Sequence, residues 1–345
     1  MFKKRILVGM SGGVDSSVSA ILLQEQGYEV VGATMVLFDS NDINEGCLSS
    51  SAVNDAKKVC QKLGIEHHVI DLKDYFKKYV INNFVENYKN GMTPNPCVQC
   101  NKYLKFGALF DKAKELKCEY IATGHYARVE DGYLKKSNAD KKDQTYFLYG
   151  IKKEVLPYIV FPLKDFKDKE EIREIAKKHD LFVATKKDSQ EICFIPNDDY
   201  KSYLEKKIKP IKGNFVDSKG NILGTHKGII YYTVGQRKGL GISAKQPLYV
   251  TNINKTKNEI TLGTINELYK DSLIAKDINL LVDEIPKNIT AKIRYRSNNA
   301  KCSVELLDNN TMKIIFDEPQ KSITKGQSVV LYSDDIVVGG GIIFE

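Results

Sequence analysis

Apolar and polar positions alternate in blocks along the first half of the chain. Short apolar runs with the length and β-branched content of buried strands lie at residues 5–10, 29–37, 66–72 and 120–123. Stretches with the spacing of amphipathic helices separate them, at residues 16–26, 51–63 and 75–88. This alternation is typical of a parallel sheet covered by helices. The pattern therefore predicts a doubly wound α/β fold, whose ligands bind at the carboxyl ends of the strands.

The pattern changes beyond about residue 207, where glycines punctuate short β-branched segments. Toward the carboxyl end, these segments recur at the spacing of about 8 to 12 residues that is typical of small barrels. They lie at residues 290–295, 302–307, 312–316, 328–332 and 336–338. We expect a break at residues 268–275. The prediction is an α/β domain at residues 1–206, followed by two small, mainly β domains at residues 207–272 and 273–345.

Length and charge refine this picture. The 345 residues exceed the roughly 100 to 200 that are usual for one domain. A net charge of +8, from 52 basic and 44 acidic residues, favours a polyanionic partner, although a generally basic proteome explains it equally well. No apolar run reaches the roughly 18 residues of a membrane span, and the amino terminus leads into a strand rather than a signal sequence. We therefore expect a cytosolic protein without a membrane segment.

A glycine-rich loop follows the first predicted strand and opens a helix, with the sequence Gly9-Met10-Ser11-Gly12-Gly13-Val14-Asp15-Ser16. Free amides and the helix dipole converge there, and paired glycines let phosphate oxygens approach the backbone. The serines can donate hydroxyl hydrogen bonds, and Asp15 can orient magnesium or a donor. The loop lacks the Gly-Lys-Ser/Thr of kinases and GTPases. A tight strand-to-helix turn with a serine N-cap is the structural alternative.

The seven cysteines are too few and too unevenly spaced for a disulfide framework. Cys97 and Cys100 form a Cys-x-x-Cys pair at a predicted helix start, which should lower a thiol pKa, and Cys193 lies in an apolar, strand-like setting. A structural zinc site would need a second ligand pair, which is missing. An iron–sulfur cluster held by Cys97, Cys100 and Cys193 is a second hypothesis. A redox pair of Cys100 and Cys193 that handles sulfane sulfur is the favoured one.

The glycine-rich loop resembles the PP-loop of ATP pyrophosphatases, which adenylylate a carbonyl oxygen. Together with the other motifs, in order over nearly the full length, the chain is similar to the bacterial tRNA-specific 2-thiouridylases. The matching motifs, besides residues 11–16, lie at residues 46–64, 93–102, 122–126, 142–144, 192–195, 235–237, 294–296 and 339–341. In many members of that family an aspartate stands at the position of Cys97, so a carboxylate step there is in doubt for this chain.

The resemblance implies an enzyme that replaces the C2 oxygen of the tRNA wobble uridine with sulfur. It assigns the nucleophile to Cys100, the persulfide to Cys193, and a transient disulfide to the two together. ATP, with magnesium, is expected at residues 9–16, Met35 and Gly124. The target base and the tRNA are expected at Asn95, Pro96, Cys97, His125, Lys142, Asp143, Gln144, Arg294, Tyr295 and Gln327. The expected partners are tRNA and a persulfide donor such as a cysteine desulfurase or a sulfur-relay protein. Lysines at 206, 207, 209 and 212 are expected to add attraction to the RNA backbone.

Overall fold

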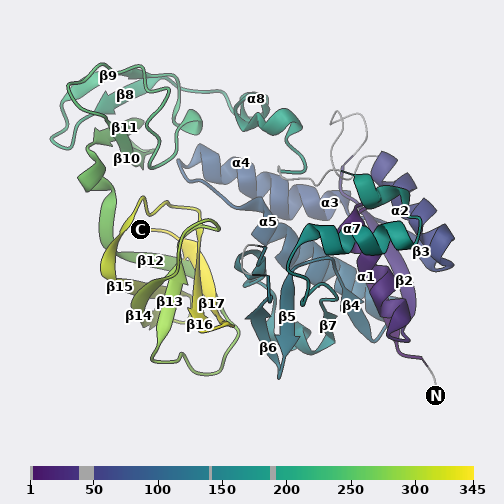
Figure 1. The fold of residues 1–345 in the computed structure, drawn as a ribbon. Helices are drawn as coiled ribbons and strands as arrows, with labels where there is room; N and C mark the ends of the chain where they lie inside the picture. Colours follow the sequence, from purple (N-terminus) through teal and green to yellow (C-terminus); the bar gives the residue numbers. More distant parts are fainter. Residues whose placement is uncertain (1–2, 39–49, 140–141, 187–191) are drawn as a thin grey trace. The chain divides into compact units, whose positions relative to one another are not determined.

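The computed structural model describes residues 3–38, 50–139, 142–186 and 192–345 (Figure 1). Residues 46–49, at the start of the motif at residues 46–64, lie outside the described residues, as do residues 187–191 just before the motif at residues 192–195. The chain divides into two compact units. The first comprises Met1–Val80, Cys97–Asp198 and Asp335–Val337, and the second comprises Ile81–Pro96, Asp199–Asp334 and Val338–Glu345. No helix in the described part of the chain is long and apolar enough to cross a membrane.

The first unit is built on a parallel sheet with the strand order β3-β2-β1-β4-β7. Its strands are β1 (Arg5–Gly9), β2 (Glu29–Val36), β3 (Glu66–Asp71), β4 (Tyr120–Ala122) and β7 (Ile159–Val160). Since β1 lies between β2 and β4, the order of the chain reverses beside β1. Such a reversal opens a crevice at the carboxyl ends of the strands. The predicted doubly wound α/β fold is confirmed.

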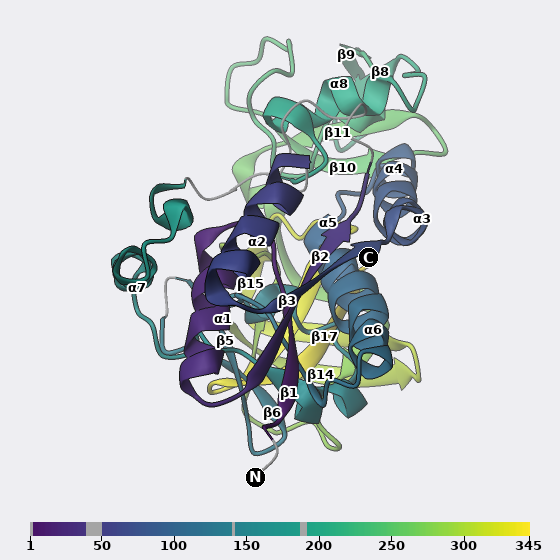
Figure 2. The same ribbon diagram turned by 90° about the vertical axis from the view of Figure 1, so that its right-hand side faces the viewer.

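Helices cover both faces of this sheet. Figure 2 shows α1 (Val14–Glu25), α2 (Ser50–Leu63) and α7 (Lys169–Lys178) on one face and α6 (Leu109–Glu115) on the other. Fully buried Ile6, Val8 and Val18 belong to the core between β1 and α1. The N-cap of α7 is Asp168, whose carboxylate accepts hydrogen bonds from the first-turn amides of Glu170 and Glu171.

Two longer helical stretches of the chain each contain a π-helical segment. The predicted helix at residues 75–88 consists of α3 (Lys73–Phe76), the π-helix η1 (Lys77–Ile81) and α4 (Asn82–Lys89). The cysteine-bearing stretch consists of α5 (Pro96–Gln99), the π-helix η2 (Cys100–Ala108) and α6. A π-helix joins residues i and i+5, so it brings together side chains that an α-helix separates. Long π-helices are rare, and they occur frequently at functional sites.

Short elements complete the first unit. They are the hairpin β5 (Ala127–Glu130) and β6 (Tyr133–Lys136), and the 3₁₀ helices η3 (Thr145–Phe147), η4 (Lys153–Tyr158), η5 (Phe182–Thr185) and η6 (Pro196–Asp198). The segment Asp335–Val337 belongs to this unit, because Ile336 pairs with Lys135 of β6.

The second unit is mainly β, as predicted. After α8 (Tyr200–Glu205) comes a sheet with the order β10-β11-β8-β9. Its elements are β8 (Gly213–Val216), β9 (Ile222–His226), η7 (Ile229–Tyr231), β10 (Tyr249–Asn254), β11 (Glu259–Gly263) and η8 (Ile265–Leu268).

The last strands form the ring β12-β15-β14-β13-β16-β17, which pairing between β12 and β17 closes into a barrel. They are β12 (Tyr269–Leu280), β13 (Ile289–Lys292), β14 (Ala300–Asp308), β15 (Thr311–Lys321), β16 (Ser328–Ser333) and β17 (Ile336–Ile343). The barrel interior is filled by buried aliphatic side chains such as Ile314, Val329 and Leu331. β12 begins at Tyr269, within the expected break at residues 268–275. The domain boundaries stay a prediction.

Candidate functional site

The glycine-rich loop connects β1 to α1 at the carboxyl end of the sheet. Gly12 has a positive φ of +69°, and a Cβ there would lie 2.5 Å from the carbonyl oxygen of Ala52 on α2. Only glycine therefore fits between the loop and α2. Gly13 caps α1 without contributing a side chain, so the first-turn amides of α1 remain available to a bound anion.

The serines of this loop have unequal roles. Ser16 and Ser17 are buried, and their hydroxyls donate to the carbonyl oxygen of Gly13 at 3.1 Å and 2.8 Å. The hydroxyl of Ser16 also accepts a hydrogen bond from the amide of Ser11 at 3.2 Å. Ser11 itself is exposed. Ser16 and Ser17 hold the loop in shape, and the hydroxyl of the exposed Ser11 lies 3.1 Å from that of Ser16. Contact of Ser11 with a nucleotide stays a prediction.

Asp15 does not offer a magnesium site in this arrangement. Its Oδ2 lies 2.6 Å from the ammonium of Lys169, and its Oδ1 accepts a hydrogen bond from the hydroxyl of Tyr126 at 3.1 Å. Both oxygens thus have a donor, and a lysine neutralises the charge that would attract a cation. The surroundings of Asp15 do not fit a resident metal, so magnesium that accompanies ATP is treated as part of the substrate.

Two other residues expected at the nucleotide lie close to the loop or in the sheet beside it. A Cβ on Gly124 would lie 2.9 Å from the Cβ of Asp15 and 3.0 Å from the amide nitrogen of Ser16. Glycine is therefore required there for the end of β4 to approach the start of α1. Met35 is buried in β2 and pairs with Ile70 of β3. Its contact with adenine stays a prediction.

The thiols of Cys97 and Cys100 do not have the lowered pKa expected at a helix start. Cys97 is exposed and Cys100 is half-buried, but the protein around both displaces water that would solvate a thiolate. Burial raises the pKa of Cys100 to about 11, against a smaller lowering by the charge of Lys105. It also raises the pKa of Cys97, which Lys105 again opposes. The prediction was wrong because loss of solvation outweighs the helix dipole here.

His125, which is buried, and Lys105, which is half-buried, form a polar pair whose charge acts on these thiols. The Lys105 ammonium lies 3.2 Å from Nε2 of His125, and Nδ1 of His125 lies 2.6 Å from the hydroxyl of Thr123. Because an ammonium only donates, Nε2 is the acceptor and Nδ1 carries the hydrogen. Burial, together with the charge of Lys105, holds the pKa of His125 well below its ordinary 6.5, so its ring is neutral. Direct contact of His125 with tRNA stays a prediction.

Alkylation should reveal the high pKa of Cys100 in the protein without substrates. The thiolate is the reactive form, so labelling of Cys100 by iodoacetamide is expected to be slow at pH 7 and to rise from pH 9.0 toward about 11. Peptide mass spectrometry after timed quenching measures the rate for each cysteine. A rate that levels off below pH 9.0, the ordinary thiol pKa, would contradict the expected shift.

Cys193 lies in a turn, not in the strand-like setting that its apolar neighbours suggest. The amide of Ile195 donates to the carbonyl of Ile192 at 2.9 Å, and Phe194 is buried edge-on against Phe76 of α3, with 5.5 Å between ring centroids. The apolar neighbours anchor the turn instead of pairing in a sheet. Since α3 also packs against η2, the turn of Cys193 and the helix of Cys100 share a neighbour.

The cysteines do not assemble a metal site among the residues that the structure describes. No group of three or more His, Cys, Asp or Glu side chains comes together there as a possible metal site. Cys97, Cys100 and Cys193 in their present positions therefore do not fit an iron–sulfur cluster, and no step is derived through one.

The predicted RNA-contacting segment 142–144 is tied to the rest of the first unit. Asp143 accepts hydrogen bonds from the amide of Ser137 at 3.2 Å and from the hydroxyl of Thr145 at 2.6 Å. The backbone amide of Tyr126 donates to the side-chain oxygen of Gln144 at 3.0 Å, and the backbone amide of Gln144 donates to the carbonyl of Tyr126 at 3.0 Å. Since Tyr126 also contacts Asp15, this segment is linked to the glycine-rich loop.

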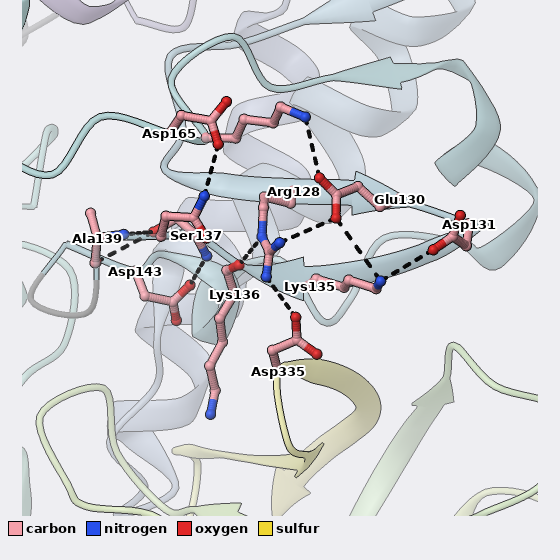
Figure 3. A network of polar contacts seen from close by, with 12 residues as sticks. Arg128, Glu130, Asp131, Lys135, Lys136, Ser137, Ala139, Asp143, Asp165 and Asp335 are labelled. Atoms are coloured by element: carbon pink, nitrogen blue, oxygen red, sulfur yellow. Dashed lines mark hydrogen bonds and ion pairs between the residues drawn. The ribbon is translucent and has the colours of Figure 1, made fainter.

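A charged network fixes the hairpin that precedes this segment (Figure 3). Arg128 on β5 donates to Glu130 at 3.1 Å, to the carbonyl of Lys136 at 2.6 Å and to Asp335 at 2.6 Å. Lys135 on β6 lies 3.3 Å from Asp131. The network holds β5 and β6 together.

In the second unit, the predicted target-base segment is held by a turn of the barrel. The amide nitrogen of the Gln327 side chain donates to the carbonyl of Thr93 at 2.7 Å, and the backbone amide of Thr93 donates to the carbonyl of Lys325 at 2.8 Å. These contacts fix the chain just before Asn95 and Pro96. Gln327 therefore supports this segment. Its contact with tRNA stays a prediction.

Arg294 also has internal partners. Its guanidinium donates to the carbonyls of Val234 and Ser322 at 3.1 Å and 2.9 Å and to the hydroxyl of Thr324. The neighbouring Tyr295 is half-buried, with the ammonium of Lys292 5.8 Å from its ring centroid. Phosphate contact by Arg294 stays a prediction. The lysines at 206, 207, 209 and 212 are all exposed, as RNA attraction requires.

Three lysines of this site were not predicted from the sequence: Lys105, Lys169 and Lys186. The charge of Lys105 acts on both thiols, and its ammonium contacts His125. Lys105 is five residues after Cys100 on a π-helix, whereas α-helical spacing would place the two residues further apart around the helix. Lys186 donates to the carbonyl of Gly12 at 3.0 Å and to Asp55 at 2.8 Å. The one signal in the sequence is that the loop itself contains no lysine. This could have suggested that lysines from elsewhere in the chain contact it.

Family models cover most of the chain. Residues 4–197 match the tRNA methyl transferase HUP domain, residues 201–264 match the tRNA methyl transferase PRC-barrel domain, and residues 270–343 match the aminomethyltransferase beta-barrel domain. A weak structural likeness, with a TM-score of 0.35 and 21% identity, exists to the U34-tRNA thiolase NcsA from Methanococcus maripaludis, over 60% of this chain and 66% of that one. It is too weak to bear on function.

Full-length relatives are much closer. The chain is 50% identical to the tRNA-specific 2-thiouridylase MnmA of Clostridioides difficile, over 99% of this chain and 98% of the relative. It is 51% identical to the protein of that name from Clostridium beijerinckii, over 99% of both chains. Identity at this level, over the glycine-rich loop, the cysteine pair and the β-rich half together, shows that the chain belongs to the family of tRNA-specific 2-thiouridylases.

Proposed function

We propose that the protein replaces the C2 oxygen of the wobble uridine of tRNA with sulfur, using ATP and a protein-bound persulfide. The observation that carries the proposal is the presence, in one compact unit, of the glycine-rich loop between β1 and α1 and of the turn and helix that bear Cys193 and Cys100. Loops of this kind occur in enzymes that adenylylate many different substrates. The two cysteine thiols in the same unit favour sulfur transfer as the reaction of this protein.

The first step activates the base. The C2 oxygen attacks the α-phosphorus of ATP, the bond to pyrophosphate breaks, and the amides of the loop at residues 11–16 stabilise the departing charge. The uridine must leave the anticodon stack to reach this site. Asn95, Pro96 and Cys97 are proposed to contact the base, with Met35 and Gly124 at the nucleotide.

The second step transfers sulfur. The terminal sulfur of a persulfide on Cys193 attacks C2 and displaces AMP, which leaves the tRNA joined to Cys193 through a sulfur–sulfur bond. The thiolate of Cys100 then attacks the Cys193 sulfur, so 2-thiouridine departs and a disulfide between Cys100 and Cys193 remains for a reductant to open. Lys105 favours the thiolate electrostatically, which offsets part of the unfavourable burial.

The β-rich half is proposed to bind the tRNA. Residues 207–272 then form a central tRNA-binding domain and residues 273–345 a carboxyl-terminal β-barrel domain, and both follow a catalytic domain at residues 1–206. His125, residues 142–144, Arg294, Tyr295 and Gln327 are the proposed contacts. A cysteine desulfurase or a sulfur-relay protein is the proposed source of the persulfide.

Incubating the protein with ATP, unmodified tRNA and a persulfide donor tests the function. The expected product is tRNA whose mass has risen by the difference between one sulfur and one oxygen atom, with one AMP and one pyrophosphate per sulfur. Nucleoside analysis should place the sulfur at C2 of the wobble uridine. Unchanged tRNA mass in the presence of bound ATP and tRNA would refute the proposal.

A further inference from the structure

The glycine-rich loop needs positive charge that its own sequence does not supply. Pyrophosphate leaves with several negative charges. In phosphate-binding loops with the Gly-Lys-Ser/Thr sequence, a lysine inside the loop neutralises part of the charge of the β- and γ-phosphates. Residues 11–17 contain no basic side chain. Two lysines from elsewhere in the first unit approach this loop instead, Lys169 from α7 and Lys186 from the segment after η5.

The two lysines differ in how they are bound. Lys169 forms a close pair with Asp15, and only 15% of its side chain is exposed, so its charge is already compensated inside the protein. Lys186 is 41% exposed, and its ammonium lies 3.0 Å from the carbonyl oxygen of Gly12 and 2.8 Å from Asp55 on α2. A lysine ammonium has three donor hydrogens. After these two acceptors, Lys186 retains one that a ligand in the loop can use.

Lys186 is also held in place by its backbone. Arg173 on α7 donates to the carbonyl of Ala184 at 2.5 Å and to the carbonyl of Lys186 at 3.0 Å. The α7 helix packs against α1 and η5. The Lys186 backbone is therefore fixed relative to the helix whose amino end forms the anion site, and its long side chain provides the adjustable part.

We infer that Lys186 is a phosphate-binding residue of this site, whose ammonium contacts the β- and γ-phosphates of ATP and the departing pyrophosphate. The inference rests on the proposed ATP-dependent function and adds to it the group that neutralises the leaving group. When the bond between the α-phosphorus and the bridging oxygen breaks, the electron pair moves onto pyrophosphate. Lys186 stabilises that charge beside the loop amides. Gly12 and Asp55 hold the ammonium near the site until the nucleotide arrives.

Binding of inorganic pyrophosphate, ATP and AMP to the full-length protein, measured by calorimetry without tRNA, tests this role. Lys186→Gln retains a donor for the Gly12 carbonyl but removes the charge. It is expected to weaken pyrophosphate and ATP binding roughly 10- to 100-fold, the worth of a charged hydrogen bond. AMP lacks the phosphates that Lys186 contacts, so its affinity should stay within about twofold. Lys186→Arg should bind all three ligands nearly as the unaltered protein does.

Lys178→Gln is the matched control, because Lys178 is an exposed lysine at the end of α7. Unchanged pyrophosphate binding in Lys186→Gln would overturn the assignment. An equal loss of AMP binding would also overturn it, because Lys186 would then only support the fold. If the unaltered protein binds ATP and pyrophosphate but leaves tRNA unthiolated, the proposed function fails and the assignment of Lys186 stands.

Discussion

Replacing Cys193 with serine is expected to reduce thiolation by roughly 10³-fold or more while leaving ATP binding within about twofold. A serine hydroxyl forms no persulfide, so the reaction loses its sulfur carrier. ATP binding should survive because the glycine-rich loop is held by β1, α1, Tyr126 and Lys169. Single-turnover transfer from a persulfide donor to tRNA, with ATP affinity measured in parallel, checks both halves of this expectation.

The Cys100→Ser variant separates the roles of the two thiols. Sulfur still reaches C2, but no thiolate cleaves the bond to Cys193. The expected result is therefore a tRNA–protein adduct that a small thiol reductant releases as thiolated tRNA. Cys118→Ser is the matched control, since Cys118 is buried just before β4, and a serine retains a hydrogen bond to the carbonyl of Leu116. Full thiolation by Cys193→Ser, or a non-reducible adduct in Cys100→Ser, would contradict the proposed sequence of steps.

Regular periodicity allowed the parallel sheet to be predicted closely. The strand predicted at residues 29–37 is β2, Glu29–Val36, and the helix predicted at residues 51–63 is α2, Ser50–Leu63. Burial on both faces of a parallel strand leaves a continuous apolar run, and a surface helix leaves its own period. The loop between β1 and α1 was equally visible, because glycine pairs at a strand end have few other uses.

Features that depend on distant residues were not predictable in this way. The pKa of Cys100 follows from how much water the folded chain excludes, and a helix start in the sequence carries no information about that. The apolar residues around Cys193 indicated a strand, but Phe194 instead packs against Phe76, which is far away in sequence. Lys186 reaches Gly12 across 174 positions of the chain. No local pattern records such a contact.

Substituting Gly12 with alanine is expected to lower the thiolation rate by about a hundredfold or more, through displacement of the phosphate-binding amides. The new Cβ would meet the carbonyl oxygen of Ala52 at 2.5 Å, so the loop or α2 must move. A misplacement of about 1 Å is enough to cost about a hundredfold in rate. ATP affinity should fall with the rate, because the same amides are proposed to bind the phosphates of ATP before the reaction.

Gly64→Ala isolates the effect of this collision. Gly64 has a φ of +65°, close to the +69° of Gly12, but a Cβ there meets nothing within 4 Å. In both variants the left-handed backbone conformation of alanine lowers the free energy of unfolding by about 1 to 2 kcal/mol. Only Gly12→Ala adds the clash with Ala52. Urea denaturation measures the free energy of unfolding of each variant, and calorimetry measures the ATP affinity of each. If Gly12→Ala bound ATP and thiolated tRNA as Gly64→Ala does, the close approach of Ala52 would not shape the phosphate site.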